Sequence, residues 1–271
     1  NFPPVQVIES AEYITIQTDK LGVRLPASQG SSALCPGPVV GLTDKQGKWI
    51  GISKLETSGK KLKSITTRAV SVGPLFAEYN VKYSFEGGSG YDVYIKCING
   101  YDFFEVKEKM NGFSETDSAF WEINWNGFSP THIQGSPIWS YTKSGTKTDN
   151  NGITDNPGFG RFDWEPIDQV LYPVSNGVMD YSNMNGRIFF EVDVYENNDQ
   201  KRLPSALFWD EKSMQSIGVF MNDASWWNDH LYPIWNVSGK LSVVFYYRDK
   251  QLLWRYPINN GTRSTAISCY D

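Results

Sequence analysis

Hydrophobic and polar residues alternate along much of this chain. The clearest runs are residues 91–98 and 103–110, which are separated by the turn sequence Asn99-Gly100-Tyr101-Asp102 and predict a β-hairpin. Alternation with a period of two buries one face of a strand and leaves the other in water. These runs are therefore typical of antiparallel sheets.

The same pattern recurs in both halves of the chain, and helix signals are few. Further strands are predicted at residues 13–18, 81–85, 187–195, 205–209, 217–221, 241–247, 252–256 and 264–268. The sequence 210–213 reads as a turn, 248–251 predicts a second hairpin, and the final run is expected to close the sheet. The predicted fold class is all-β: a large antiparallel two-sheet sandwich, or supersandwich, with little helix.

The middle of the chain has a different composition. Residues 126–186 are rich in Gly, Pro, Asn, Ser and Asp, and 142–160 reads as one long loop. Such loops are often functional, and the alternative left open is disorder. Because strand patterns before and after this stretch look alike, residues 1–271 are predicted to form a single sandwich domain.

Composition narrows the function classes. The chain has 271 residues, 40% of them hydrophobic and 20% charged, which is typical of a globular protein with a substantial core. Its net charge of -5 and pI of about 5.2 offer no basic field for nucleic acid or anionic lipid, so an uncharged ligand is the easier fit. No run is apolar and long enough to predict membrane insertion.

Aromatic residues are unusually frequent. Ten Trp, fifteen Tyr and fifteen Phe make up 15% of the chain. Most are expected to fill the core, as aromatics do in β proteins. We also expect at least one Trp on the surface as a platform for a sugar ring.

Metal and cofactor chemistry is not expected. The three cysteines, Cys35, Cys97 and Cys269, form no metal-binding motif, and their pairing stays open. No nucleophile elbow, dinucleotide fingerprint or phosphate-binding loop is present. The chain begins Asn1-Phe2-Pro3-Pro4, without an initiator Met, which reads as the start of a processed protein or as the edge of a piece of a longer one. On the first reading, the protein is expected to be secreted or periplasmic.

Several blocks resemble the β-supersandwich of galactose-mutarotase-like proteins. The blocks are residues 37–41, 47–51, 73–79, 91–98, 103–110, 208–212, 223–227, 232–235, 254–257 and 260–265. The resemblance implies the accessory or N-terminal sandwich of a glycoside hydrolase or polysaccharide lyase, whose catalytic partner is often a helical toroid. Since this chain shows no such helical region, it is expected to be one domain of a longer carbohydrate-active enzyme. Mutarotases use a His acid and a Glu base, and the resemblance assigns no residue here to either role.

The densest group of candidate ligand-binding residues lies between Asp223 and Trp235. It supplies Trp226, Trp227 and Trp235 as apolar faces for sugar C–H groups, with Asp229 and His230 as polar partners. The alternative is a loop whose Trp residues pack into the core and whose Asp and Asn residues form turns.

The second candidate is the segment 121–126. On a strand, Trp121, Ile123 and Trp125 share one face, and Glu122 shares the other with two Asn residues. Glu122 is a candidate acid or hydroxyl ligand if its face is concave. His132 and Trp139 follow closely and are expected to border the same cleft.

Arginines form a third group of candidates. Arg255 and Arg263 have the planar fork that binds a uronate carboxylate, and the more common alternative is that they tie loops together. The segment 161–165 alternates acids with aromatics, and an ion pair is the expected role there.

Three functions remain, in this order. The first is a glycan-binding or structural sandwich domain whose partner is an oligo- or polysaccharide. The second is an enzyme in its own right (an aldose epimerase, glycosidase or lyase) with Glu122, His132 and His230 as catalytic candidates. The third is a protein-binding surface or adhesion domain.

Overall fold

The structure of the chain is a computed structural model, which describes most of the N-terminal half and parts of the C-terminal half. The described residues are 3–30, 35–43, 47–57, 59–114, 117, 119–136, 165–166, 174–175, 178–179, 187–188, 205–221, 244–248 and 251–270. Apart from the short 3-10 helix η1 (Glu86–Gly88), every element in them is a β-strand. Every pair of neighbouring strands in them is antiparallel.

One layer is a ten-stranded sheet that joins the two halves of the chain. In order across the sheet, its strands are β14 (Glu165–Pro166), β13 (His132–Ser136), β18 (Ser205–Asp210), β19 (Gln215–Met221), β22 (Gly261–Tyr270), β11 (Phe103–Asn111), β10 (Gly90–Ile98), β9 (Phe76–Phe85), β8 (Leu62–Val72) and β4 (Gln29–Gly30). The last strand of the chain, β22, lies between β11 and β19. It is therefore an interior strand that links N-terminal and C-terminal strands, and it contains the predicted strand 264–268.

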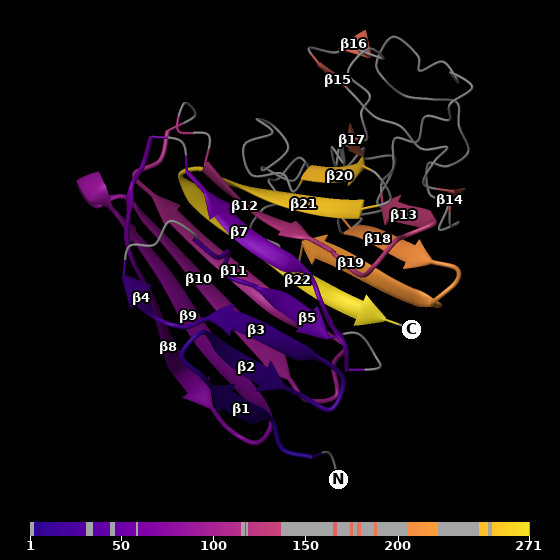
Figure 1. The fold of residues 1–271 in the computed structure, drawn as a ribbon, viewed down its shortest axis with the longest axis horizontal. Coiled ribbons are helices and arrows are strands. Elements are labelled where there is room, and N and C mark those ends of the chain that lie inside the picture. The colour runs from indigo at the N-terminus through magenta and orange to yellow at the C-terminus, as the bar shows by residue number, and fades with distance from the viewer. Residues whose placement is uncertain are drawn as a thin grey trace, which may run out of the picture.

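Two five-stranded sheets make up the other layer (Figure 1). The first contains β1 (Gln6–Glu9), β2 (Tyr13–Gln17), β3 (Gly22–Pro26), β5 (Gly41–Thr43) and β6 (Trp49–Ile50). The second contains β17 (Arg187–Ile188), β20 (Val244–Arg248), β21 (Gln251–Ile258), β12 (Ala119–Asn124) and β7 (Ile52–Glu56). A separate pair is formed by β15 (Val174–Ser175) and β16 (Val178–Met179).

A bend at Gly51 carries the chain from one five-stranded sheet to the other. The strand β6 ends the first sheet and β7 ends the second, and only Gly51 separates them in sequence. Gly51 has a φ of 91°, in the left-handed region that favours glycine, and a Cβ there would lie 3.3 Å from Ile123 and 3.4 Å from Trp125. Because the edges β6 and β7 are continuous, the two sheets lie side by side in one layer in front of the ten-stranded sheet (Figure 1).

One hydrophobic core fills the space between the layers. It includes alternate residues of β10, where Val93, Ile95 and Cys97 are fully buried as the hairpin pattern predicts. Contacts cross the sandwich at both ends: the Tyr79 hydroxyl donates to Glu9 at 3.2 Å, and the rings of Phe208 and Trp254 lie 5.7 Å apart. The predicted all-β sandwich is therefore confirmed, together with its first hairpin.

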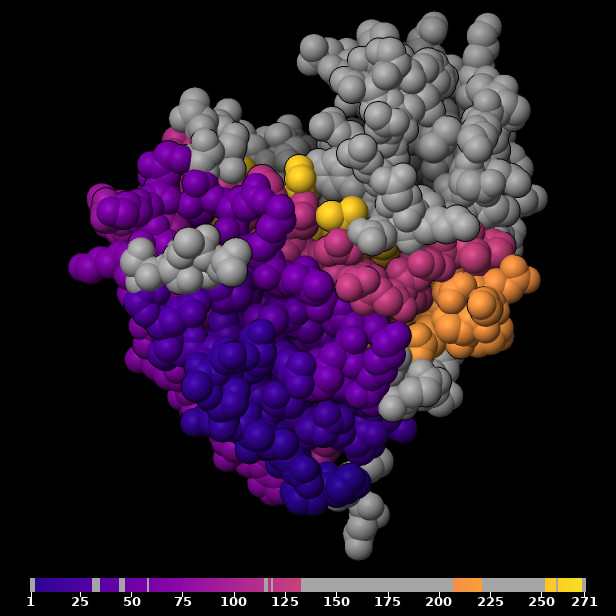
Figure 2. Space-filling model, in the orientation of Figure 1, coloured from indigo at the N-terminus to yellow at the C-terminus, as the bar shows by residue number. Residues whose placement is uncertain are grey.

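The space-filling view shows the front layer as a surface. Side chains of the N-terminal strands cover its lower left, and residues of β18 and β19 emerge only at the right edge (Figure 2). The outward face of the front layer is therefore exposed to solvent, while its inward face packs on the ten-stranded sheet.

Candidate functional site

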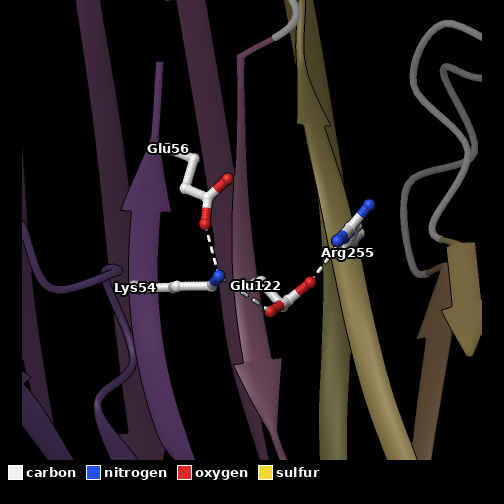
Figure 3. Close-up of polar contacts among 4 residues, drawn as sticks. All are labelled: Lys54, Glu56, Glu122 and Arg255. Carbon is white, nitrogen blue, oxygen red and sulfur yellow. Dashed lines mark hydrogen bonds and ion pairs between the residues drawn. The ribbon is translucent and has the colours of Figure 1, made fainter. Parts of the chain in front are cut away.

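Three charged side chains line up across the outward face of the second five-stranded sheet. Glu122 on β12 lies directly opposite Lys54 on β7 and directly opposite Arg255 on β21. The neighbouring residues Trp121 and Ile123 are fully buried, so strand alternation turns Glu122 away from the core. Figure 3 shows the carboxylate between the two cations, with Glu56 beside Lys54 on the same strand.

Glu122 is the centre of this charged row. The Nε atom of Arg255 donates to Glu122 Oε2 at 2.5 Å, and Lys54 Nζ lies 3.4 Å from Oε1 (Figure 3). Lys54 also forms an ion pair with Glu56. Charge-assisted bonds of this kind are shorter and stronger than neutral ones, so they hold the Glu122 carboxylate in one orientation.

Exposure differs sharply within the row. The Glu122 side chain is 6% exposed, whereas those of Arg255 and Lys54 are 36% and 51% exposed. The Arg255 guanidinium also lies over the Phe120 ring, with its Cζ 4.5 Å from the ring centroid. The carboxylate is therefore covered, and the two cations carry N–H groups to the surface from fixed positions.

Lys54 remains a cation across the physiological pH range. Its pKa is raised above the ordinary value, mainly by its bond to Glu56 and also by the nearby Glu122 charge, although burial acts in the opposite direction. An ammonium and a guanidinium on either side of a carboxylate form a set of donors and acceptors suited to polar, hydroxyl-rich ligands.

Arg263, the second candidate arginine, lies inside the sandwich. Its side chain is 0% exposed, and it forms two bonds of 2.5 Å to the carboxylate of Glu108. Glu108 also accepts hydrogen bonds from the Tyr91 hydroxyl at 2.6 Å and from the Trp121 indole at 3.2 Å. The guanidinium of Arg263 therefore ties β22 to β11, in the linking role that the sequence left open.

His132 lies on the opposite layer from Glu122. It is the first residue of β13 and lies directly opposite Trp209 on β18, with ring centroids 5.1 Å apart. Phe208 is fully buried and faces Trp254 across the core, so Trp209 and His132 face outward from the ten-stranded sheet. Glu122 and His132 therefore point away from opposite faces of the sandwich, and the structure does not bring them together.

The remaining sequence candidates lie outside the described residues. These are Trp139, Trp226, Trp227, Asp229, His230 and Trp235. Their roles stay predictions.

Sequence reasoning missed Lys54, Glu56 and Phe120. Residues 52–56 alternate between exposed and buried positions in the structure, but their hydropathy does not follow this alternation, because Ile52 is 60% exposed and Ser53 is buried. The pairing of β7 with β12 joins segments that are far apart in the sequence, and no local pattern encodes it. The sequence therefore did not show that Lys54 lies opposite Glu122, because it did not show which strand pairs with β12.

The described residues hold no group of three or more His, Cys, Asp or Glu side chains placed to bind a metal. All three cysteines are free thiols, and burial raises the pKa of Cys35 to about 12. None of the helices in the described part of the chain is long and apolar enough to span a membrane.

Comparison with known proteins assigns no family. No protein-family model and no curated protein matches the chain. Among solved structures, the chain is similar to an alpha-mannosidase from Enterococcus faecalis V583, with a TM-score of 0.48 and 8% sequence identity. The match covers 94% of this chain and 29% of the mannosidase chain, so this chain spans less than a third of that protein. A likeness at this level assigns no activity.

Proposed function

We propose that this chain is a carbohydrate-binding β-sandwich domain that binds a glycan on the outward face of β7, β12 and β21. One observation carries the proposal: the covered Glu122 carboxylate holds two half-exposed cations, Lys54 and Arg255, on a solvent-facing sheet. The proposal extends to an accessory role in a glycoside hydrolase or polysaccharide lyase of the galactose-mutarotase-like supersandwich type. Secretion or export to the periplasm belongs to the same proposal.

The chemistry of the charged row suits sugar hydroxyls. A hydroxyl both donates and accepts, so neighbouring hydroxyls on a ring bind where donors and acceptors alternate at fixed positions. Lys54 and Arg255 offer donors and the half-exposed Glu56 offers an acceptor, while the covered Glu122 holds the two cations in position. These four charges sum to zero, which favours a ligand that carries hydroxyl groups over one that carries a large net charge.

Binding, and not catalysis, is the function that the geometry favours. Acid–base cleavage of a glycosidic bond needs two groups that face each other across one bond. Glu122 and His132 face away from opposite layers, so they do not form such a pair. The charged row is therefore suited to recognising a ligand, and His132 does not supply the second group that acid–base cleavage would need.

Isothermal titration of the intact chain against a panel of neutral and acidic oligosaccharides tests the proposal. We expect at least one oligosaccharide to bind, and Glu122→Gln to weaken it roughly fivefold, because the partly exposed bonds that hold Arg255 and Lys54 in position are worth about 1 kcal/mol. Glu86→Gln is the matched control, since Glu86 forms a well-exposed ion pair with Lys61 at 3.3 Å. Absence of binding to the whole panel, or equal binding by both variants, would contradict the proposal.

A separate observation favours protein binding as a second function. Val70, Val72 and Leu75 are 50%, 52% and 69% exposed around the bend between β8 and β9. The Leu75 carbonyl accepts from Asn99, which brings the 48% exposed Tyr101 to the same end of the sheet. Exposed apolar groups of this kind mark interaction sites. Light scattering of the wild type and of Leu75→Ser tests it: a monomer in both cases removes self-association as the explanation.

A further inference from the structure

Guanidinium groups stacked on aromatic rings recur in the described residues. The Arg255 Cζ lies 4.5 Å from the Phe120 ring centroid, and the Arg263 Cζ lies 5.0 Å from that of Tyr256. Arg24 lies over two rings, 3.8 Å from the centroid of Trp49 and 5.6 Å from that of Tyr13. A stacked guanidinium uses its flat face for the ring, and its N–H groups remain available in its own plane.

Two of these arginines use that plane to hold a carboxylate. Arg255 binds Glu122 and Arg263 binds Glu108, each through its Nε at 2.5 Å. In both cases the carboxylate comes from the residue directly opposite on the neighbouring strand. Both arginines therefore share one arrangement: an aromatic ring lies against the guanidinium, and a carboxylate accepts from its Nε.

Arg24 has the ring partners but lacks the carboxylate. The residues directly opposite it are Thr15 on β2 and Gly41 on β5, neither of which is charged. No carboxylate of the described residues forms an ion pair with Arg24. The side chain is half-buried on the outward face of β3, between the buried residues Val23 and Leu25. A fixed cation that lacks an internal acid is suited to an external one.

The local sequence builds this ring-flanked cation. A Cβ on Gly41 would lie 3.6 Å from Cε3 of Trp49, so the indole ring lies close over the backbone of β5. A distance of 3.6 Å is an ordinary van der Waals contact, so the ring packs beside the residue directly opposite Arg24.

The Arg24 group and the Glu122 row belong to one face. Trp49 on β6 and Lys54 on β7 both point outward, since Ile50 and Leu55 are buried next to them. Trp49 and Lys54 are five positions apart, so at roughly 3.3 Å per residue their backbones are separated by at most about 16 Å. One oligosaccharide is long enough to bridge this separation and to contact both groups across the Gly51 bend.

We propose that Arg24 binds the carboxylate of a uronic-acid residue in a glycan, with the Trp49 and Tyr13 rings holding its guanidinium in position. This inference rests on the proposed glycan-binding function and names its acidic subsite. It also reassigns uronate recognition, because the arginines first considered for it, Arg255 and Arg263, already hold carboxylates of the chain.

The test compares a uronic-acid oligosaccharide with the same oligosaccharide after methyl esterification of its carboxylates, using titration calorimetry on the intact chain. We expect the wild type to bind the acid form at least tenfold more tightly than the ester. Arg24→Gln removes that preference, because the acid form then binds no more tightly than the ester. Arg24→Lys keeps the charge but loses the planar fork, so most of the preference is lost. Arg68→Gln, at an exposed position on β8 of the other layer, is the matched control and changes neither value.

The outcomes separate this inference from the function beneath it. Equal binding of acid and ester by the wild type, or an acid preference that survives Arg24→Gln, overturns the role of Arg24 and leaves glycan binding standing. Failure to bind either form, along with every other oligosaccharide, overturns both. Equally tight, Arg24-dependent binding of a poly-glutamate peptide overturns the assignment to a sugar. Unchanged thermal unfolding midpoints of the variants show that each loss is local.

Discussion

The sandwich contains the same cross-strand ion pair twice, once inside and once outside. Glu108–Arg263 joins β11 to β22 and Glu122–Arg255 joins β12 to β21, each through an Nε–Oε2 bond of 2.5 Å between directly opposed residues. The inner pair has 0% exposed side chains, whereas the outer pair has side chains that are 36% and 6% exposed. The same kind of ion pair is therefore fully buried inside the sandwich and partly exposed on its outward face.

Burial decides which role each pair has. Taking two charges out of water is expensive, and the inner pair is compensated by hydrogen bonds from Tyr91 and Trp121 to the same carboxylate. A ligand in solvent cannot reach that network, so its role is to stabilise the fold. The outer pair reaches water through Arg255 and Lys54, so a ligand is able to compete for it. Position relative to the core therefore separates a structural pair from a recognition pair.

The largest effect is expected when the inner pair loses one charge. Glu108→Gln leaves the guanidinium of Arg263 buried without a counter-charge, and we expect the free energy of unfolding to fall by about 3–5 kcal/mol. Urea unfolding monitored by Trp fluorescence measures it. A loss below about 1 kcal/mol would mean that the inner pair is not a structural element.

Trp121→Phe is expected to have the next largest effect. It removes the indole donor to Glu108, whose bond is 3.2 Å long, and weakens the stacked contact with Tyr256, whose ring centroid is 4.0 Å away. Loss of a hydrogen bond to a charged group costs about 1.5–3 kcal/mol. A double-mutant cycle with Glu108→Gln isolates the coupling, and full additivity of the two losses would show that the network is not shared.

High pH is expected to destabilise the inner region progressively. Burial raises the pKa of Tyr83, Tyr91 and Tyr256 well above the ordinary value of 10.0, and that of Tyr79 to about 12. The native state thus keeps these phenols protonated while the unfolded chain ionises them. Their contribution is complete below pH 10 and falls as pH rises, by about 1.4 kcal/mol per pH unit for each suppressed tyrosine.

Spectrophotometric titration of the phenolate absorbance follows this change. We expect the buried tyrosines to ionise together with cooperative unfolding, after the exposed ones. Smooth ionisation of all tyrosines near pH 10 with the fold intact would contradict the burial of these rings.

The smallest effect on stability is expected at the outer pair. Glu122→Gln breaks a bond to a cation that is 36% exposed, so solvent screening limits the loss to about 1 kcal/mol or less. Raising the salt concentration should shrink the difference from the wild type further. A loss as large as that of Glu108→Gln would place Glu122 among the structural residues and remove the contrast between the pairs.

Strand positions were readable from the sequence because alternation is a local property. The run 91–98 became β10, and the face shared by Trp121, Ile123 and Trp125 is fully buried. The aromatic excess is explained in part by this core, which also buries Trp254. Which strands pair is not local, so neither the insertion of β22 between β11 and β19 nor the row of Lys54, Glu122 and Arg255 was predictable.

The side of the sandwich to which a residue points was also beyond local reading. Glu122 and His132 are close in sequence, and the chain crosses from one layer to the other between them. Proximity in sequence suggested a shared cleft, whereas the crossover places the two side chains on opposite outward faces. Arg24 escaped attention because its significance rests on the absence of a charged residue opposite it.

The most direct test of glycan binding on the outward face is the NMR signal of the arginine Nε–H groups during titration with a bound oligosaccharide. Arg255 and Arg263 provide matched probes, since each donates its Nε–H to a carboxylate at the same distance. We predict that the Arg255 signal shifts in proportion to the fraction of protein bound and that the Arg263 signal stays in place. An Arg255 signal that does not move while calorimetry reports binding would place the glycan elsewhere and contradict the account.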